Sequence, residues 1–340
     1  MPSALFEGFA RLRAAGYERG WLPSVRVAVP VVSVGNLSAG GTGKTPCVAF
    51  LAREFQRRGW CAGVLSRGYR APRGASEREN DEARWLESAL PGVERVQDPE
   101  RVAGARVLIE RGVDVILLDD GFQHRRLARD LDLVLLDATR PWGLPPPPRG
   151  GAPVCACLPR GLLREPPAAL GRADALVITR ADQADARALE ALRAALAVLA
   201  PGRPILSATH RPARLSGPDG VPLALDELRG REVELVSALG NPEAFQRTVE
   251  SLGARVLGHR VFPDHHDYGP EDLAGAEVSG RWLVTSEKDG VKLARFGRCH
   301  VLGTEFELLD GGAVLAALLD SLRPGQARRA RAALHEGLHG

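Results

Sequence analysis

Near its N-terminus the chain reads VVSVGNLSAGGTGKT, which are residues 31–45. The apolar residues Val31–Val34 predict a short strand, and Ser38–Thr45 form a glycine-rich loop. A helix is expected from about Lys44 to Arg58, because apolar residues recur there at helical spacing. A strand, a glycine loop and a helix in this order form a phosphate-binding unit.

Each residue type in the loop contributes to holding a triphosphate. Glycines let backbone N–H groups wrap an anion, and the start of the helix adds a partial positive charge. Lys44 is expected to reach the β and γ phosphates, and the hydroxyl of Thr45 to hold Mg²⁺. We predict that ATP is bound by Ser38, Ala39, Gly40, Gly41, Thr42, Gly43, Lys44 and Thr45.

A phosphate loop also needs an acidic residue that orients the metal ion. The strand predicted at Val113–Leu118 is followed by Asp119 and Asp120, and the strand predicted at Leu133–Leu136 is followed by Asp137. Two adjacent carboxylates at a strand end can both face the edge of the sheet where ligands bind. The first pair is therefore favoured, with Asp137 as the alternative.

The chain after this unit continues to alternate strands and helices, which is typical of an α/β fold with a parallel sheet covered on both faces. At 340 residues it is long enough for two domains. Arg211–Leu225 predicts a β-hairpin between them. The predicted divisions are an N-terminal amphipathic helix in 1–28, a P-loop domain in 29–205, a hairpin linker in 206–230, a smaller α/β domain in 231–325 and a basic tail in 326–340.

The N-terminal helix, expected at residues 3–20, has two interpretations. Leu5, Phe9 and Leu12 form an apolar stripe, widened by Phe6, which either packs on the domain or lies in a membrane interface. No apolar run reaches the roughly 18 residues needed to span a bilayer. The net charge of +3 does not indicate a nucleic-acid partner, and the five cysteines lack metal-site spacing, which fits reduced thiols in the cytoplasm.

Three classes of protein use such a loop. A switch ATPase usually carries lysine where Ala39 stands, which counts against that class. A regulatory GTPase would need a guanine-recognition segment, and Thr179–Asp182 and Thr285–Asp289 are only near matches. A small-molecule kinase would need a base for the acceptor hydroxyl, which Asn80–Glu82 or Phe262–Asp267 offers unless these are solvated surface residues.

Several of these segments together resemble the tetraacyldisaccharide 4′-kinase family, the lipid A 4′-kinases of Gram-negative bacteria. The resemblance covers nearly the whole chain, and its most specific part is Asp119–Asp130 (DDGFQHRRLARD). The other matching segments follow in order: Val34–Leu37, Leu65–Tyr69, Leu162–Pro166, Phe262–His265 and Ser286–Asp289. The chain departs from the family at Arg160, where alanine is expected, and in the proline-rich stretch Pro141–Pro153.

The resemblance implies an activity and a place of action. The γ-phosphate of ATP is expected to pass to the 4′-hydroxyl of a tetraacylated glucosamine disaccharide 1-phosphate, giving lipid IVA in lipid A (lipopolysaccharide) biosynthesis. It also implies two α/β/α domains joined by a two-stranded β linker. The enzyme is expected to be peripheral, at the cytoplasmic face of the inner membrane, with the lipid-linked disaccharide and the membrane surface as partners and no obligate protein partner.

Residue roles follow from the same resemblance. The family's Gly-Asp-Glu-Pro segment matches Asn80–Ala83, so Asp81 is the expected base, and His265 is expected to orient it from the other domain. Lys44 completes the catalytic set. The Mg²⁺ candidates are Thr45, Asp119, Asp120 and Glu82, and the positions expected near the acceptor sugar or its phosphate are Asn36, Arg67, Tyr69, Gln123, His124 and Arg164.

Overall fold

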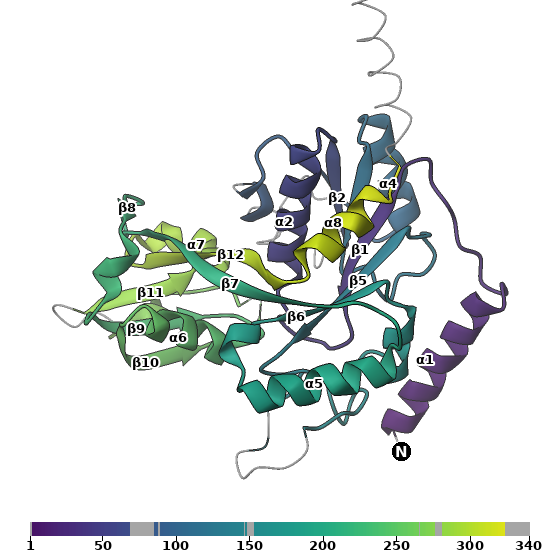
Figure 1. Ribbon diagram of the computed structural model, residues 1–340. Coiled ribbons are helices and arrows are strands. Elements are labelled where there is room, and N and C mark those ends of the chain that lie inside the picture. Colours follow the sequence, from purple (N-terminus) through teal and green to yellow (C-terminus); the bar gives the residue numbers. More distant parts are fainter. Residues whose placement is uncertain are drawn as a thin grey trace, which may run out of the picture. The chain divides into compact units, whose positions relative to one another are not determined.

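The chain divides into two compact units, each built from separate stretches of sequence (Figure 1). The first comprises residues 1–70, 90–209 and 308–340, and the second comprises 71–89 and 210–307. The contiguous boundaries given above remain a prediction. The computed structural model describes residues 2–68, 85–87, 89–145, 147, 153–264, 266–275 and 281–323, so the predicted basic tail lies outside the described residues.

A parallel sheet forms the centre of the first unit. The strands β1, β4, β5 and β6 are buried along their whole length, because apolar residues occupy both of their faces. The start of β7 (Ile205–Ser216) pairs in parallel with β6. In spatial order the sheet contains β6 (Ala175–Thr179), β5 (Leu131–Asp137), β1 (Val31–Asn36), β4 (Val115–Asp119), β2 (Ala62–Ser66) and β3 (Glu94–Gln97).

Helices cover both faces of this sheet, and Figure 1 shows α2 (Lys44–Arg57) and α5 (Ala186–Leu199) on opposite sides. The helix α2 packs on β1, β2 and β4, whereas α4 (Arg101–Glu110) packs on β2 and β3. Leu192 and Leu196 of α5 belong to a core cluster with residues of β5 and β6. The last helix, α8 (Gly312–Asp320), is tied to the C-terminal end of α2 by an ion pair of 3.1 Å between Arg58 Nε and Asp320 Oδ1.

The N-terminal helix α1 (Pro2–Glu18) buries little of its own surface. Among residues 3–18 only Gly16 is buried. Leu5, Phe9 and Leu12 are 66%, 72% and 62% exposed, so the apolar stripe seen in the sequence faces away from the core. None of the described helices is long and apolar enough to cross a membrane.

The second unit contains a smaller parallel sheet of β10 (Arg255–Val261), β9 (Glu232–Ser237), β11 (Trp282–Ser286) and β12 (His300–Asp310). The helices α6 (Pro242–Ser251) and α7 (Glu287–Leu293) pack beside it, on β10 and β11 respectively. In the sheet order β12 is next to β7, which also pairs antiparallel with β8 (Pro222–Leu223). Short 3₁₀ helices complete the described elements: η1 (Pro167–Arg172), η2 (Ala181–Gln183), η3 (Leu225–Leu228), η4 (Pro270–Leu273) and η5 (Ala294–Phe296).

The predicted parallel α/β architecture is confirmed, with differences at element ends. The expected hairpin has a second strand of only two residues, Pro222 and Leu223. Neither β3 nor α4 was predicted. β3 has the sequence ERVQ and no buried residue, so it lacks the apolar run that identifies an inner strand.

The close approach of β1 to Phe122 generates a testable prediction. A Cβ atom at Gly35 would lie 2.4 Å from Cβ of Phe122 and 2.7 Å from its backbone nitrogen. Gly35→Ala should therefore lower the free energy of unfolding by about 1–3 kcal/mol, as overpacking of a core does. Urea denaturation measures this, with Gly8→Ala as the control, since a Cβ atom there would meet no atom within 4 Å beyond its chain neighbours and the adjacent backbone of its own helix. Equal midpoints for both variants would contradict the packing argument.

Candidate active site

The phosphate loop leaves β1 at its carboxyl end and turns directly into α2. Gly43 precedes the helix with a positive φ of 84°, a conformation that glycine adopts without the strain of a side chain. No side chain caps the first turn of α2, so its N–H groups are available to an anion. Inside the loop, Asn36 Nδ2 donates to Thr42 Oγ1 at 3.0 Å and to the Gly40 carbonyl at 3.3 Å. Asn36, which was predicted to lie near the acceptor sugar, therefore also holds the conformation of the phosphate loop.

The last residue of β6 and the residue that follows it support the phosphate loop. Thr179 Oγ1 donates to the Thr42 carbonyl at 3.0 Å, and Arg180 donates to the Gly41 carbonyl at 3.0 Å. Arg180 also forms an ion pair with Asp137, the alternative metal ligand. The segment that nearly matches a guanine-recognition motif thus braces the phosphate loop instead.

The other near match, Thr285–Asp289, also has a structural role. Asp289 is 1% exposed and accepts hydrogen bonds from the backbone of Ala238 at 3.1 Å and from Ser286 Oγ at 2.8 Å. Burial raises the pKa of Asp289, although these hydrogen bonds oppose the shift. A carboxylate enclosed in this way is not presented to a nucleotide base.

The two adjacent carboxylates after β4 take different positions. Asp119, the last residue of β4, has its Oδ2 3.5 Å from Oγ1 of Thr45 at the start of α2. Asp119 is 5% exposed, and the hydroxyl and carboxylate together offer two oxygen atoms at the sheet edge. Oxygen ligands of this kind suit Mg²⁺.

Asp120 lies with two cations. Its Oδ1 is 3.4 Å from Nζ of Lys44, and its two carboxylate oxygens accept from Arg164 Nη1 at 2.8 and 2.7 Å. Although burial opposes ionisation, the positive charges of Lys44 and Arg164 lower the pKa of Asp120 to about 2. Arg164, predicted to lie near the acceptor sugar, thus contacts Asp120, which is both a predicted metal ligand and the partner of Lys44.

The loop after Asp120 carries Gln123 and His124. Gln123 Nε2 donates to the Asn36 carbonyl at 3.0 Å, which brings two predicted acceptor residues together. His124 Nε2 is buried and has no hydrogen-bond partner among the described residues. Burial, and then the positive charge of Arg101, lower the pKa of His124 to about 4, so its imidazole is neutral at neutral pH.

Arg101 is a candidate that the sequence analysis missed. It is the first residue of α4, 3% exposed, and its Nε has no hydrogen-bond partner among the described residues. Burial lowers the pKa of its guanidinium; Asp120 opposes that shift, whereas Arg67, exposed just after β2, adds to it. A buried arginine near these groups was hidden in the sequence because α4 itself was not predicted.

Four predicted site residues lie outside the described residues: Tyr69, Asp81, Glu82 and His265. The described neighbours of two of them contact α7. Trp85, four positions after Asp81, donates from Nε1 to Glu287 Oε2 at 3.0 Å. The sequence analysis assigned this stretch to the first domain, whereas Trp85 clusters with the second unit.

The residues on either side of His265 are held by lysines of the same helix. Lys288 Nζ lies 2.9 Å from Asp264 Oδ1, and Lys292 Nζ donates to the His266 carbonyl at 2.8 Å. His266 Nε2 in turn lies 2.8 Å from Asp272 Oδ2. The predicted base and its predicted partner are therefore flanked by segments that are both fastened to α7.

The depressed pKa values predict how stability depends on pH. A group with a lowered pKa in the folded state favours unfolding as protons bind, so its contribution is present at high pH and lost on acidification. For His124 the loss falls between about pH 6.5 and 4, and for Asp120 between about pH 3.8 and 2. His124→Gln should therefore lose less stability than wild type between pH 7 and 5, measured by urea midpoints. Identical losses would contradict the burial argument.

Comparisons with known proteins show which family the chain belongs to. The family model "LpxK: Tetraacyldisaccharide-1-P 4′-kinase" matches residues 1–323. The tetraacyldisaccharide 4′-kinase of Anaeromyxobacter dehalogenans is 44% identical over 345 residues, covering 94% of this chain and 88% of that protein. That of Geobacter sulfurreducens is 36% identical and covers 94% of this chain and 91% of its own length.

A solved structure extends the likeness to the fold. LpxK from Aquifex aeolicus, in complex with ATP, superposes with a TM-score of 0.70 at 28% identity, covering 93% of this chain and 96% of that one. The predicted fold class is thereby confirmed, as is the prediction of a kinase over a GTPase or switch ATPase. The chain belongs to the tetraacyldisaccharide-1-P 4′-kinase family.

Proposed function

We propose that this protein transfers the γ-phosphate of ATP to the 4′-hydroxyl of a tetraacylated glucosamine disaccharide 1-phosphate, giving lipid IVA. One observation carries the proposal beyond family membership. Lys44 and Thr45, at the start of α2, lie 3.4 and 3.5 Å from two adjacent carboxylates at the end of β4. Phosphoryl transfer depends mainly on such placed charges, because the transition state has little covalent chemistry for the protein to perform.

The residues present fit a magnesium ion. Thr45 and Asp119 would hold it, since their oxygens already face each other, and Asp120 is engaged by Lys44 and Arg164. We therefore assign the direct metal contact to Asp119 ahead of Asp120 and Glu82. When bound, the ion supplies positive charge that neutralises the phosphate oxygens. Lys44 adds charge at the transferring group, and Asp120 keeps its ammonium oriented.

The acceptor side rests on fewer described residues. Asp81 would accept the hydroxyl proton late in the reaction, with His265 holding its carboxylate in orientation. Neutral His124, with its buried Nε2, would form a hydrogen bond to the acceptor without adding charge. Arg164 would act through Asp120, because both carboxylate oxygens of that residue already accept from it.

We also propose that α1 lies on the cytoplasmic face of the inner membrane. The exposure of Leu5, Phe9 and Leu12 supports this location, because a helix packed on its own domain would bury that stripe. The substrate's acyl chains would stay in the bilayer while its sugar reaches the site.

The central experiment incubates purified protein with ATP, Mg²⁺ and the acceptor lipid and measures one added phosphate by mass spectrometry. Lys44→Ala should lower kcat by about 10²–10³, as loss of a group that stabilises transition-state charge does. Arg57→Ala, on the exposed side of the same helix, is the matched control and should match wild type. If Lys44→Ala keeps more than about a tenth of wild-type kcat, the assignment of Lys44 is wrong.

Asp81 and His265 are expected to act as one unit. Asp81→Ala should lower kcat by about 10²–10⁴, the usual contribution of a general base. His265→Ala should cost less, and the double variant should be little worse than Asp81→Ala alone. The KM for ATP should change little in all three, since neither residue belongs to the phosphate loop. Additive losses in kcat would instead indicate two independent roles.

Membrane contact by α1 is tested with vesicles. Replacing Phe6 and Phe9 by Ser should weaken vesicle flotation more than it lowers the melting temperature, because both side chains are exposed, Phe9 at 72% and Phe6 at 37%. A large fall in melting temperature with unchanged flotation would identify α1 as a core element.

A further inference from the structure

The side chain of Arg125 holds the last turn of α1. Its Nη1 donates to the Ala14 carbonyl at 3.0 Å and lies 3.4 Å from Oε1 of Glu18. Its guanidinium carbon is 5.2 Å from the ring centroid of Tyr17. The Arg125 side chain is 16% exposed, whereas that of Glu18 is 58% exposed. A cation is also favourable at the C-terminal end of a helix.

The backbone of Arg125 belongs to the loop that follows Asp120 and carries Gln123 and His124. Its N–H donates to the Gln123 carbonyl at 3.2 Å, and its own carbonyl accepts from Ser24 Oγ at 2.7 Å. Gln123 reaches in the other direction, to the Asn36 carbonyl at 3.0 Å. Arg125, which contacts α1, therefore directly follows Gln123 and His124, the residues predicted to lie near the acceptor sugar.

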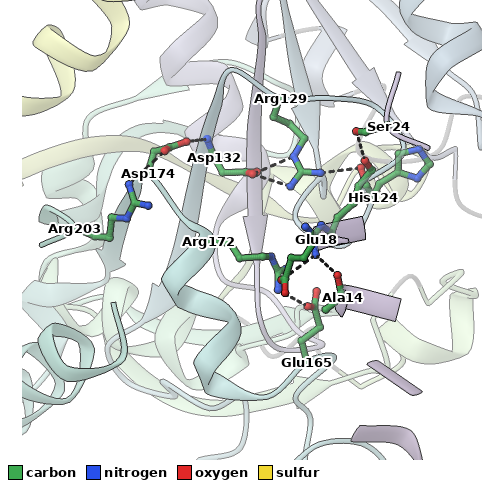
Figure 2. A network of polar contacts seen from close by, with 11 residues as sticks. Ala14, Glu18, Ser24, His124, Arg129, Asp132, Glu165, Arg172, Asp174 and Arg203 are labelled. Carbon is green, nitrogen blue, oxygen red and sulfur yellow. Dashed lines mark hydrogen bonds and ion pairs between the residues drawn. The ribbon is translucent and has the colours of Figure 1, made fainter. Parts of the chain in front are cut away.

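The far end of the loop is fastened independently of α1. Arg129 Nη1 donates to the His124 carbonyl at 3.2 Å, and its guanidinium forms two bonds of 3.0 and 2.8 Å with Asp132. The backbone of Asp132 is bound in turn by Asp174 (Figure 2). The loop is thus anchored to β5 at one end, and Arg125 is its anchor to α1.

The charge of Arg125 links it electrostatically to Glu18 of α1. Burial and the positive charge of Arg172 lower the pKa of the Arg125 guanidinium, and Glu18 opposes that shift. Figure 2 shows Glu18 and Ala14 on the α1 side of this cluster, with Arg172 and Arg129 on the other. Moving α1 away would remove the carboxylate and the helix carbonyl from Arg125, and no described carboxylate is spare beside it, because Glu165 pairs with Arg172 and Asp132 with Arg129.

We propose that Arg125 is a positioning residue that couples α1, seated on a phospholipid surface, to the loop that reads the acceptor's sugar. The inference rests on the proposed function, because it requires a lipid acceptor. An acceptor anchored by its acyl chains presents its sugar at a set height above the bilayer. Gln123 and His124 meet the sugar at that height only if their loop keeps a constant offset from the helix that contacts the lipid.

The test compares Arg125→Met with wild type, using the acceptor either in phospholipid vesicles or in detergent micelles. In vesicles the variant should raise the KM for the acceptor by about fivefold or more, with kcat at saturation and the KM for ATP within about twofold. In micelles, where no planar surface sets the height, the KM should change by less than about twofold. Vesicle flotation should be unchanged, since α1 keeps its apolar side chains.

Arg126→Met is the matched control, because Arg126 is the adjacent arginine and pairs with Glu100 at 2.8 Å, away from α1. It should match wild type in both media. An unchanged KM for Arg125→Met in vesicles would overturn the proposal. An equal rise in vesicles and micelles would overturn it too, because it would indicate a structural role only.

A second variant acts from the helix side, in case Arg125→Met does not fold. Glu18→Gln removes the carboxylate partner at a position where the side chain is 58% exposed, and it should raise the KM in vesicles by about two- to fivefold. No rise would overturn the coupling. The activity of the wild-type protein is measured first. If it transfers no phosphate in either medium, the proposed function is wrong. If it is active and the variants have an unchanged KM for the acceptor, only this inference is wrong.

Discussion

The parallel pairing of β1 with β4 on one side and β5 on the other determines where this protein can place polar groups. β1 is buried along its whole length, so its residues face only the core until the strand ends. The phosphate loop therefore begins at the carboxyl edge, beside the end of β4, where Asp119 is in register with Val34. Ligand chemistry gathers at this edge because the interior has no place for it.

Charge at the edge is balanced locally. Lys44 and Arg164 share Asp120, and Arg180 pairs with Asp137. Buried or half-buried cations without such partners would carry a large desolvation cost. Arg164 is far from Asp120 in sequence but lies with it in the fold. It contacts the carboxylate of Asp120, and that carboxylate contacts the ammonium of Lys44. Arg101 differs from these cations, because it is 3% exposed and its Nε has no hydrogen-bond partner among the described residues.

The sequence predicted the parts of the fold that rest on local patterns. The strand, loop and helix around Lys44 follow from an apolar run, glycines and helical periodicity, and Asp119 follows from its place after an apolar strand. β3 was missed because Glu94 is exposed and the other residues of ERVQ are only partly buried.

Side-chain contacts between segments far apart in the chain could not be predicted from the sequence. No pattern indicates that Arg180 reaches the carbonyl of Gly41, that Arg164 grips Asp120, or that Trp85 contacts Glu287. Such contacts depend on which loops the tertiary fold brings together, and side-chain type alone does not specify them. The resemblance to a family supplied candidate roles for Asp81 and His265 but no geometry for either.

The interleaving of the two units has a consequence for synthesis on the ribosome. The second unit lies inside the sequence of the first, and the first is complete only when residues 308–323 have emerged. Until then α2 lacks its ion pair between Arg58 and Asp320. The nascent chain must therefore carry an unfinished nucleotide-binding unit while it makes nearly all of the other unit. Translation therefore delays completion of the first unit until the segment that begins at residue 308 has been made.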